Sequence, residues 1–235
     1  MDYNIIFVDL ETGGYNFQKN SITNIALVGY DGEKICFEVD TLVKPYQYKV
    51  FQHQSDGPIC IISKENSWIS KYYSATLYKE LVCEESALNY TGLTLEKLEK
   101  EGMDGETLYK ELCVIFKDFK RGKKLPLLCG HNVDEFDKAF LEFLFTINGD
   151  NLYDYVSKHF IDTLWLSRFL LGSELVDNHK LETLCNYFNI NLSDAHGALA
   201  DTKSTMELYL KLQEFGKNTE IKIGEGKQQY RQFQL

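Results

Sequence analysis

The sequence has few basic side chains for the number of acidic ones. It carries 25 Lys and Arg against 35 Asp and Glu, which gives a formal net charge of −10. Proteins that coat duplex nucleic acid without regard to its sequence usually carry net positive charge. The deficit argues against that class, so any contact with nucleic acid has to be local or mediated by bound cations.

Long apolar runs and paired cysteine motifs are also missing. No run is long enough to span a membrane, and the first residues, Met1-Asp2-Tyr3-Asn4, lack the basic stretch of a signal peptide. No C-x-x-C pair occurs among the six cysteines, at positions 36, 60, 83, 113, 129 and 185. Reduced thiols are expected rather than disulfides or a zinc site, and an intracellular location follows, cytoplasmic or nuclear, with no membrane partner.

What the sequence does contain is typical of one folded domain with an appendage. Of the 235 residues, 44% are hydrophobic and 26% are charged, which is ordinary for a globular protein. We expect the domain to cover residues 1–214, with an insertion or lid at 46–82. The polar stretch 215–235 is expected to form a loose tail.

Short apolar runs that alternate with helical patterns predict the fold class. Strands are expected at about residues 5–8, 24–30, 34–43, 125–129 and 159–161. The Asp31-Gly32 turn makes the second and third of these an antiparallel hairpin. The prediction is an α/β fold with a mixed sheet of about five strands, one of them antiparallel, flanked by helices.

Apolar residues at helical spacing predict the helices. They are expected at about 106–120, 134–147, 163–171, 180–188 and 197–215, and helix-forming residues also dominate from Thr94 onward. The stretch from Pro45 to about Val82 is harder to interpret. One helical face could be formed there by Trp68, Ile69, Tyr72, Tyr73 and Leu77.

Acidic residues follow predicted strands or begin predicted helices in three parts of the chain. Asp9 and Glu11 are two apart at the end of a strand, so their side chains share a face. Asp137 lies near the start of a helix, and His196 precedes Asp201 at the start of the last one. Four ionised carboxylates brought to one sheet edge would repel one another without cations, and oxygen ligands favour Mg²⁺ or Mn²⁺.

These segments resemble the three motifs of the DEDDh 3′→5′ exonucleases, the relatives of the polymerase III proofreading subunit, ribonuclease T and the TREX enzymes. The motifs are Asp9-Leu10-Glu11-Thr12-Gly13, His131-Asn132 with Phe136-Asp137, and His196-Gly197-Ala198-Leu199-Ala200-Asp201. The resemblance covers about residues 3–214. Three residues separate Asn132 from Phe136, a spacing closest to the TREX branch.

The resemblance implies an RNase H-like fold and two-metal hydrolysis that removes nucleoside monophosphates from a 3′-hydroxyl end. Asp9, Glu11, Asp137 and Asp201 would hold two Mg²⁺ or Mn²⁺ ions, and His196 would be the general base. Single-stranded or frayed 3′ ends, DNA in preference to RNA, would be the substrate. The substrate-binding residues would be Thr12, Gly13, Tyr15, His131, Asn132 and Phe136.

Several alternatives stay open at this level. Asp134 is a rival to Asp137, and Tyr15 could stack on bases or simply pack. The basic cluster Lys117, Lys120, Arg121, Lys123 and Lys124 could follow a phosphate backbone or be a solvated helix end. An RNA exonuclease of the oligoribonuclease or ribonuclease T kind is an alternative function. So is a catalytically silent subunit that binds nucleic acid or a polymerase, and self-association is undetermined.

Overall fold

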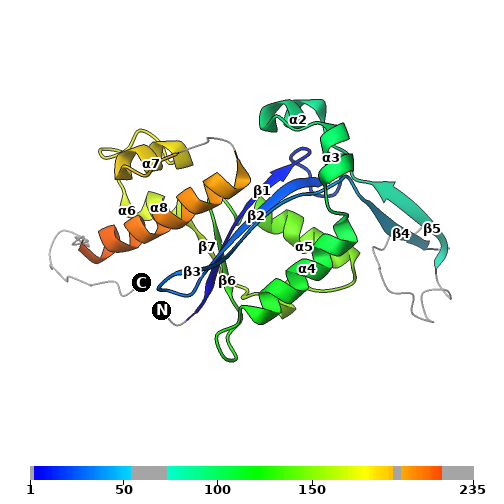
Figure 1. Cartoon of the computed structure of the whole chain (residues 1–235), viewed down its shortest axis with the longest axis horizontal. Coiled ribbons are helices and arrows are strands. Elements are labelled where there is room, and N and C mark those ends of the chain that lie inside the picture. Colours follow the sequence, from blue (N-terminus) through cyan, green and yellow to red (C-terminus); the bar gives the residue numbers. More distant parts are fainter. Residues whose placement is uncertain (1–2, 54–72, 193–196, 219–235) are drawn as a thin grey trace.

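A five-stranded mixed sheet forms the centre of the molecule (Figure 1). The structure is a computed structural model that describes residues 3–53, 73–192 and 197–218. The sheet strands are β1 (Ile5–Thr12), β2 (Ile22–Tyr30), β3 (Ile35–Leu42), β6 (Leu127–Gly130) and β7 (Phe160–Asp162). Their order across the sheet is β3-β2-β1-β6-β7.

Only β2 runs opposite to the other strands of this sheet. It pairs antiparallel with both β1 and β3, whereas β6 pairs parallel with β1 and with β7. The predicted hairpin and the predicted single antiparallel strand are therefore confirmed. Tight turns can join antiparallel strands, but each parallel pair needs a helical crossover, and the helices supply these connections.

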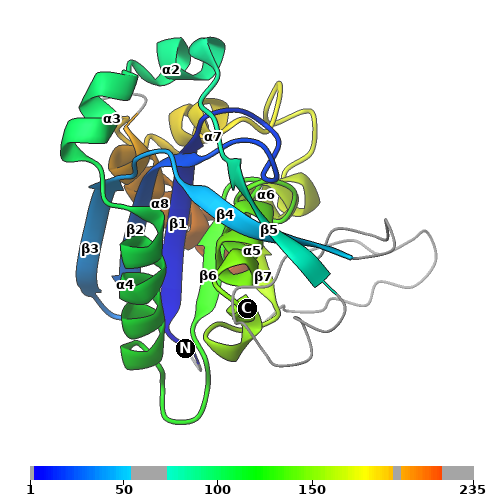
Figure 2. The same ribbon diagram turned by 90° about the vertical axis from the view of Figure 1, so that its right-hand side faces the viewer.

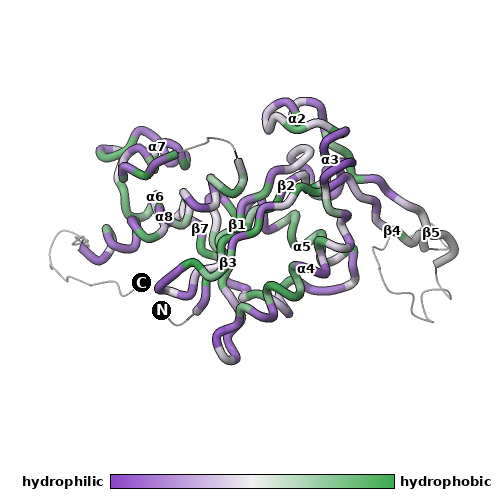
Figure 3. The backbone as a smooth tube through the Cα atoms, viewed as in Figure 1, coloured by the Kyte–Doolittle hydropathy of each residue, from purple (hydrophilic) through white to green (hydrophobic). Residues whose placement is uncertain are grey.

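Helices cover both faces of the sheet (Figure 2). Their bounds are α2 (Glu85–Thr91), α3 (Leu95–Glu101), α4 (Gly105–Asp118), α5 (Asp137–Ile147), α6 (Thr163–Leu170), α7 (Leu181–Phe188) and α8 (Ala198–Asn218), with a 3₁₀ turn at Leu152–Asp154. The apolar faces of α4 and α5 pack on one side of β1, and α8 packs on the other. Figure 3 shows apolar residues, in green, along parts of the central strands and of α4 and α5.

The stretch assigned to an insertion begins and ends as a two-stranded antiparallel sheet of β4 (Gln47–His53) and β5 (Tyr73–Glu80). The expectation of a helical face is wrong at Tyr73 and Leu77, because both lie on β5. Its other members, Trp68, Ile69 and Tyr72, lie outside the described residues. Whether the insertion acts as a lid stays a prediction.

Two predicted boundaries also differ from the structure. Helix α5 begins at Asp137 rather than at 134, and α8 continues to Asn218, so residues 215–218 belong to the helix and not to the tail. The rest of the predicted tail, 219–235, lies outside the described residues. Among the residues that are described, no helix has both the length and the apolar character needed to cross a membrane.

Candidate active site

Strand β1 carries two of the predicted carboxylates on the face covered by α8. Successive side chains of a strand point to opposite faces. Ile5 and Phe7 pack in the cluster that includes α8, so the same alternation brings Asp9 and Glu11 to that face. The apolar first half of the strand thus packs in the core, and acidic side chains take the same face near its end.

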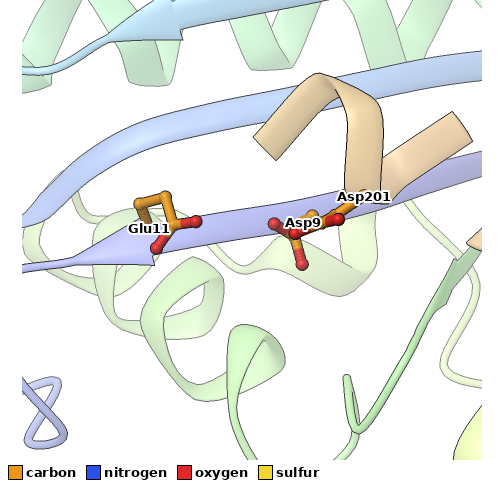
Figure 4. A group of neighbouring side chains, drawn as sticks. All are labelled: Asp9, Glu11 and Asp201. Atoms are coloured by element: carbon orange, nitrogen blue, oxygen red, sulfur yellow. The ribbon is translucent and has the colours of Figure 1, made fainter. Parts of the chain in front are cut away.

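Asp201 completes a group of three carboxylates. It lies in the first turn of α8, and carboxylate oxygens of Asp9, Glu11 and Asp201 all lie within 4.8 Å of one another. Figure 4 shows the Asp9 and Asp201 carboxylates next to each other, with Glu11 farther along the same strand. The acidic residues of the first and third motifs therefore lie together in the structure, and their role as metal ligands stays a prediction.

Asp137, the first residue of α5, contacts β1 on the edge that faces β6. The pairing of β1 with β6 ends at Phe7 and Cys129, so the Leu10 amide, farther along β1, has no partner in β6. The Leu10 N–H instead donates to Asp137 Oδ1 at 3.0 Å, and Asp137 is only 4% exposed. A buried amide donor needs an acceptor, and the first residue of α5 supplies it.

The carboxylates raise one another's pKa values. Burial raises the pKa of Asp9 well above its usual value, and the charges of Asp137, Glu11 and Asp201 raise it further. Burial and the Asp201 charge raise the pKa of Glu11 to about 7. Burial is also the main cause that brings the pKa of Asp137 to about 7, against the lowering effect of the Leu10 amide. All four acids therefore act on one electrostatic site.

The donor set fits hard divalent cations. Only carboxylate oxygens face one another in the group of three, and Mg²⁺ and Mn²⁺ prefer such ligands to nitrogen or sulfur. The raised pKa values indicate that the protein alone leaves the acids poorly compensated. A cation would supply the missing charge.

His196, the predicted general base, lies outside the described residues, between the end of the described segment at 192 and Gly197. The Gly197 carbonyl accepts from the Asp201 N–H at 3.0 Å. This bond belongs to the start of α8, the element that carries Asp201. The role of His196 stays a prediction.

Asn132 does not cap a helix, because α5 begins only at Asp137. Asn132 has a left-handed backbone, with φ of 68°, and its N–H donates to Asp162 Oδ1 at 3.0 Å. Asp162 Oδ2 also accepts from the Asp134 N–H at 3.2 Å, and Oδ1 caps α6 through the Leu164 N–H. One carboxylate therefore holds the loop between β6 and α5, and α5 starts after that loop, at Asp137.

His131 is engaged within the chain on both ring nitrogens. Nε2 lies 3.0 Å from the His179 carbonyl oxygen and Nδ1 lies 2.9 Å from Thr163 Oγ1. Burial lowers the pKa of His131, which favours the neutral ring. These contacts tie the end of β6 to the segment before α7.

A cavity of about 330 Å³ opens beside Glu11. Thr12, Tyr15 and Phe136, three of the predicted substrate-binding residues, line it, whereas Gly13, His131 and Asn132 do not. The remaining lining residues are Leu10, Glu11, Gly14, Glu84, Ser86, Ala87, Tyr90 and Thr91. The described lining contains two carboxylates and no basic side chain, so a phosphate there would need cations beside it.

Exposed aromatic rings stand at this cavity. Tyr15 is 91% exposed, which excludes a role in core packing, and its ring meets Phe136 edge-on with centroids 6.2 Å apart. Tyr90, on α2, is 74% exposed. The sequence analysis did not identify Tyr90 as a site residue, because only the fold brings it to this cavity.

The basic cluster lies at the other end of the sheet. Arg121 donates to the Asp31 carbonyl, and Lys124 stands over the Tyr3 ring at 4.6 Å. These partners lie near the start of β1, whereas the carboxylates lie toward its end. Figure 2 shows the loop after α4 at the bottom of the view, beside the N-terminus. The cluster does not line the cavity.

Metal-free protein should become less stable as the pH rises from about 4 to 8. Because the pKa values of Glu11 and Asp137 are about 7, the folded chain keeps protons that the unfolded chain releases near pH 4. Below that pH the acids are neutral in both states and cost nothing. Above about pH 7 the folded state bears the full cost of clustered charge.

Divalent ions should reverse this trend, because they compete with protons for the same oxygens. At 100 times its Kd, Mn²⁺ would add about 2.7 kcal/mol, a rise in Tm of roughly 5–10 °C, at pH 8 and much less at pH 5.5. Thermal unfolding followed by circular dichroism, in EDTA and in Mn²⁺, measures both effects. An Mn²⁺ shift that does not depend on pH would contradict a carboxylate site.

Sequence relatives of the chain are DNA polymerases. It is 35% identical over 136 residues to the PolC-type DNA polymerase III of Latilactobacillus sakei, which covers 58% of this chain. It is 26% identical over 207 residues, 88% of this chain, to the PolC-type enzyme of Bacillus cereus. The chain spans only 9% and 11% of the lengths of these two relatives. No protein-family model matches the chain.

Solved structures of Escherichia coli exonuclease I share the fold. The structure in complex with a dT13 oligonucleotide aligns with a TM-score of 0.62 at 18% identity, over 89% of this chain and 41% of that one. A zinc-bound exonuclease I complex with single-stranded DNA aligns equally well, with a TM-score of 0.62 at 17% identity, over 89% of this chain and 40% of that one. The chain is thus similar in sequence to part of PolC-type DNA polymerase III and has the fold of exonuclease I, in agreement with its predicted resemblance to the DEDDh 3′→5′ exonucleases.

Proposed function

We propose that the chain is a divalent-metal-dependent exonuclease that removes nucleoside 5′-monophosphates one at a time from the 3′-hydroxyl end of single-stranded DNA. The observation that carries the proposal is the meeting of Asp9, Glu11 and Asp201 within 4.8 Å, beside a cavity rimmed by exposed aromatic rings. The volume of this cavity, about 330 Å³, is at the low end of the range typical of small-molecule sites.

Asp9, Glu11, Asp137 and Asp201 would hold two Mg²⁺ or Mn²⁺ ions. When bound, the ions supply positive charge that stabilises the scissile phosphate and the departing 3′ oxygen. Asp137 has a second task, because its hydrogen bond to the Leu10 amide fixes the strand between Asp9 and Glu11. The spacing of the two β1 carboxylates therefore depends on α5.

His196 would take the proton from the attacking water. Its unperturbed pKa near 6.5 suits proton transfer around neutral pH. The water oxygen bonds to phosphorus, the bond from phosphorus to the 3′ oxygen breaks, and the departing 3′ oxygen takes up a proton from solvent. A nucleoside 5′-monophosphate leaves, and the shortened strand keeps a new 3′-hydroxyl for the next cycle.

The cavity would receive the terminal nucleotide. Tyr15, Phe136 and Tyr90 offer aromatic surface on which any base can stack, at roughly 1–3 kcal/mol per base. Thr12 and Gly13 would contribute close backbone approach at the end of β1. His131 and Asn132 act indirectly in this proposal, because their contacts hold the loop that leads to Asp137.

The relatives favour DNA over RNA as the substrate. PolC-type DNA polymerase III, by its name, acts on DNA, and exonuclease I has been solved with single-stranded DNA oligonucleotides. A polymerase is therefore the partner class that we propose. An intracellular setting agrees with the cysteines at 36, 83, 113, 129 and 185, which are all free thiols within the described part of the chain.

A degradation assay tests the proposal. Single-stranded DNA labelled at its 5′ end should give a descending ladder in Mg²⁺ or Mn²⁺, and EDTA should abolish it. The same oligonucleotide labelled at its 3′ end should release the label first, as a mononucleotide. Duplex DNA and RNA of the same sequence, run in parallel, should be degraded more slowly. Cleavage that persists in EDTA, or products cut internally, would overturn the proposal.

A further inference from the structure

The cavity has two walls that come from distant parts of the sequence. One wall is formed by Thr12, Gly14 and Tyr15, in the segment 12–15 at the end of β1, and the other by lining residues of the segment 84–91, which includes α2. The exposed rings of Tyr15 and Tyr90 belong to opposite walls. Figure 1 shows α2 close to the end of β1, away from the sheet centre. The gap between the walls depends on whatever joins these two segments.

Asn20 is the side chain that joins them. It is 1% exposed, and its Nδ2 donates to the Gly13 carbonyl at 3.2 Å and to Glu84 Oε1 at 3.1 Å. Its Oδ1 accepts from the Asn16 N–H at 2.9 Å. One buried amide thus contacts the first wall, the start of the second wall, and the loop between β1 and β2.

Backbone contacts close around this amide. The Gly13 carbonyl also accepts from the Glu84 N–H at 2.7 Å, and the Val82 N–H donates to the Lys19 carbonyl at 2.8 Å. A Cβ on Gly14 would lie 2.6 Å from Asn20 Cγ, so the first wall presses directly on the amide. Because there is no free space, a change in the amide should move the wall rather than be absorbed.

We propose that Asn20 is a positioning residue that sets the gap between the two walls, and so sets how tightly the base of the 3′-terminal nucleotide is held. This inference rests on the proposed exonuclease function. Asn20 does not line the cavity, so it acts through Gly13 and Glu84 rather than on the nucleotide. The group of Asp9, Glu11 and Asp201 lies outside this contact set, so metal binding should not depend on it.

Asn20→Asp tests the role with almost no change in size. The variant keeps the acceptor for Asn16, loses every bond that Nδ2 donates, and sets a second carboxylate against Glu84. We expect KM for single-stranded DNA to rise about tenfold while kcat stays within about twofold. The Tm shift produced by Mn²⁺ should be unchanged.

Removing the base from the substrate separates positioning from general damage. On an oligonucleotide whose 3′-terminal nucleotide is abasic, Asn20→Asp and the unmodified chain should have the same KM within about twofold. Adding Glu84→Gln to Asn20→Asp returns a donor to the contact and should recover most of the lost affinity for normal DNA. Asn148→Asp is the matched control, because Asn148 Nδ2 also donates to a carbonyl, that of Leu144, at the far end of α5.

Glu84→Ala provides a second route if Asn20→Asp does not fold. Glu84 is exposed, and its loss removes only the bond that Asn20 donates to its carboxylate, so KM should rise about threefold for base-bearing ends only. If the unmodified chain hydrolyses neither oligonucleotide, the exonuclease proposal is wrong, but the role of Asn20 can still be tested. Equilibrium binding of the same two oligonucleotides in Ca²⁺ should then give the ratios expected for KM. A variant that weakens normal and abasic ends equally overturns the role of Asn20.

Discussion

Asp9→Asn is expected to lower kcat/KM for single-stranded DNA by about a thousandfold or more while the fold stays intact. Asp9 is the carboxylate most affected by the others, since Asp137, Glu11 and Asp201 all raise its pKa. The substitution keeps the shape and removes one charge from the ion-binding group. A thousandfold loss corresponds to about 4 kcal/mol of transition-state stabilisation, a size that the loss of one metal ligand readily explains.

Stability should move in the opposite direction to activity. Removing one of four crowded negative charges relieves repulsion, so metal-free Asp9→Asn should melt higher than the unmodified chain at pH 8. Its Mn²⁺-induced Tm shift should shrink, because only the folded ligand set binds the ion. Asp104→Asn is the matched control: Asp104 caps α4 by accepting from the Thr107 N–H, and Asn caps equally well. Full activity in Asp9→Asn would mean that the reaction occurs elsewhere.

The parts of the site that could be predicted are those fixed by short-range periodicity. Asp9 and Glu11 follow from strand alternation, because Ile5 and Phe7 must face the core and the pleat then dictates the next two positions. Asp201 follows from its place in the first turn of α8, which packs against β1 and β2. These rules are local, and the short hairpin and the parallel crossovers leave few ways to arrange the strands.

Features that depend on single long-range contacts were not predictable. The left-handed backbone of Asn132 is one example, because its N–H is bonded to Asp162, thirty residues later in the chain. The β4–β5 pair was missed because residues 54–72 separate its strands, so no short hairpin turn marks their pairing. Tyr90 and Asn20 gain their significance only from residues distant in sequence, which no periodicity reveals.

The same long-range contacts decide between the two candidate acids of the second motif. Asp137 is 4% exposed, accepts from the Leu10 amide and acts electrostatically on Asp9. Asp134 is half exposed and forms an ion pair with Lys138 at 2.5 Å, one turn along the chain. An exposed pair of this kind is worth at most about 1 kcal/mol and has no connection to the other carboxylates. The geometry therefore favours Asp137, as the retained Phe136-Asp137 pair indicated.

Asp137→Asn and Asp134→Asn should consequently differ by at least a hundredfold in kcat/KM. The first keeps an oxygen for the Leu10 N–H and removes the charge that a cation would need, so activity should fall by about 10²–10³. The second removes only the ion pair with Lys138, so activity should stay within about twofold. Both variants are measured in the 5′-label assay over a series of Mg²⁺ concentrations.

The reverse ranking would show that the three-residue spacing after Asn132 places Asp134, and not Asp137, at the ions. Recovery of Asp137→Asn by high Mg²⁺ would support weakened ion binding as the cause, since an acid that acted only on the strand would not respond to metal concentration.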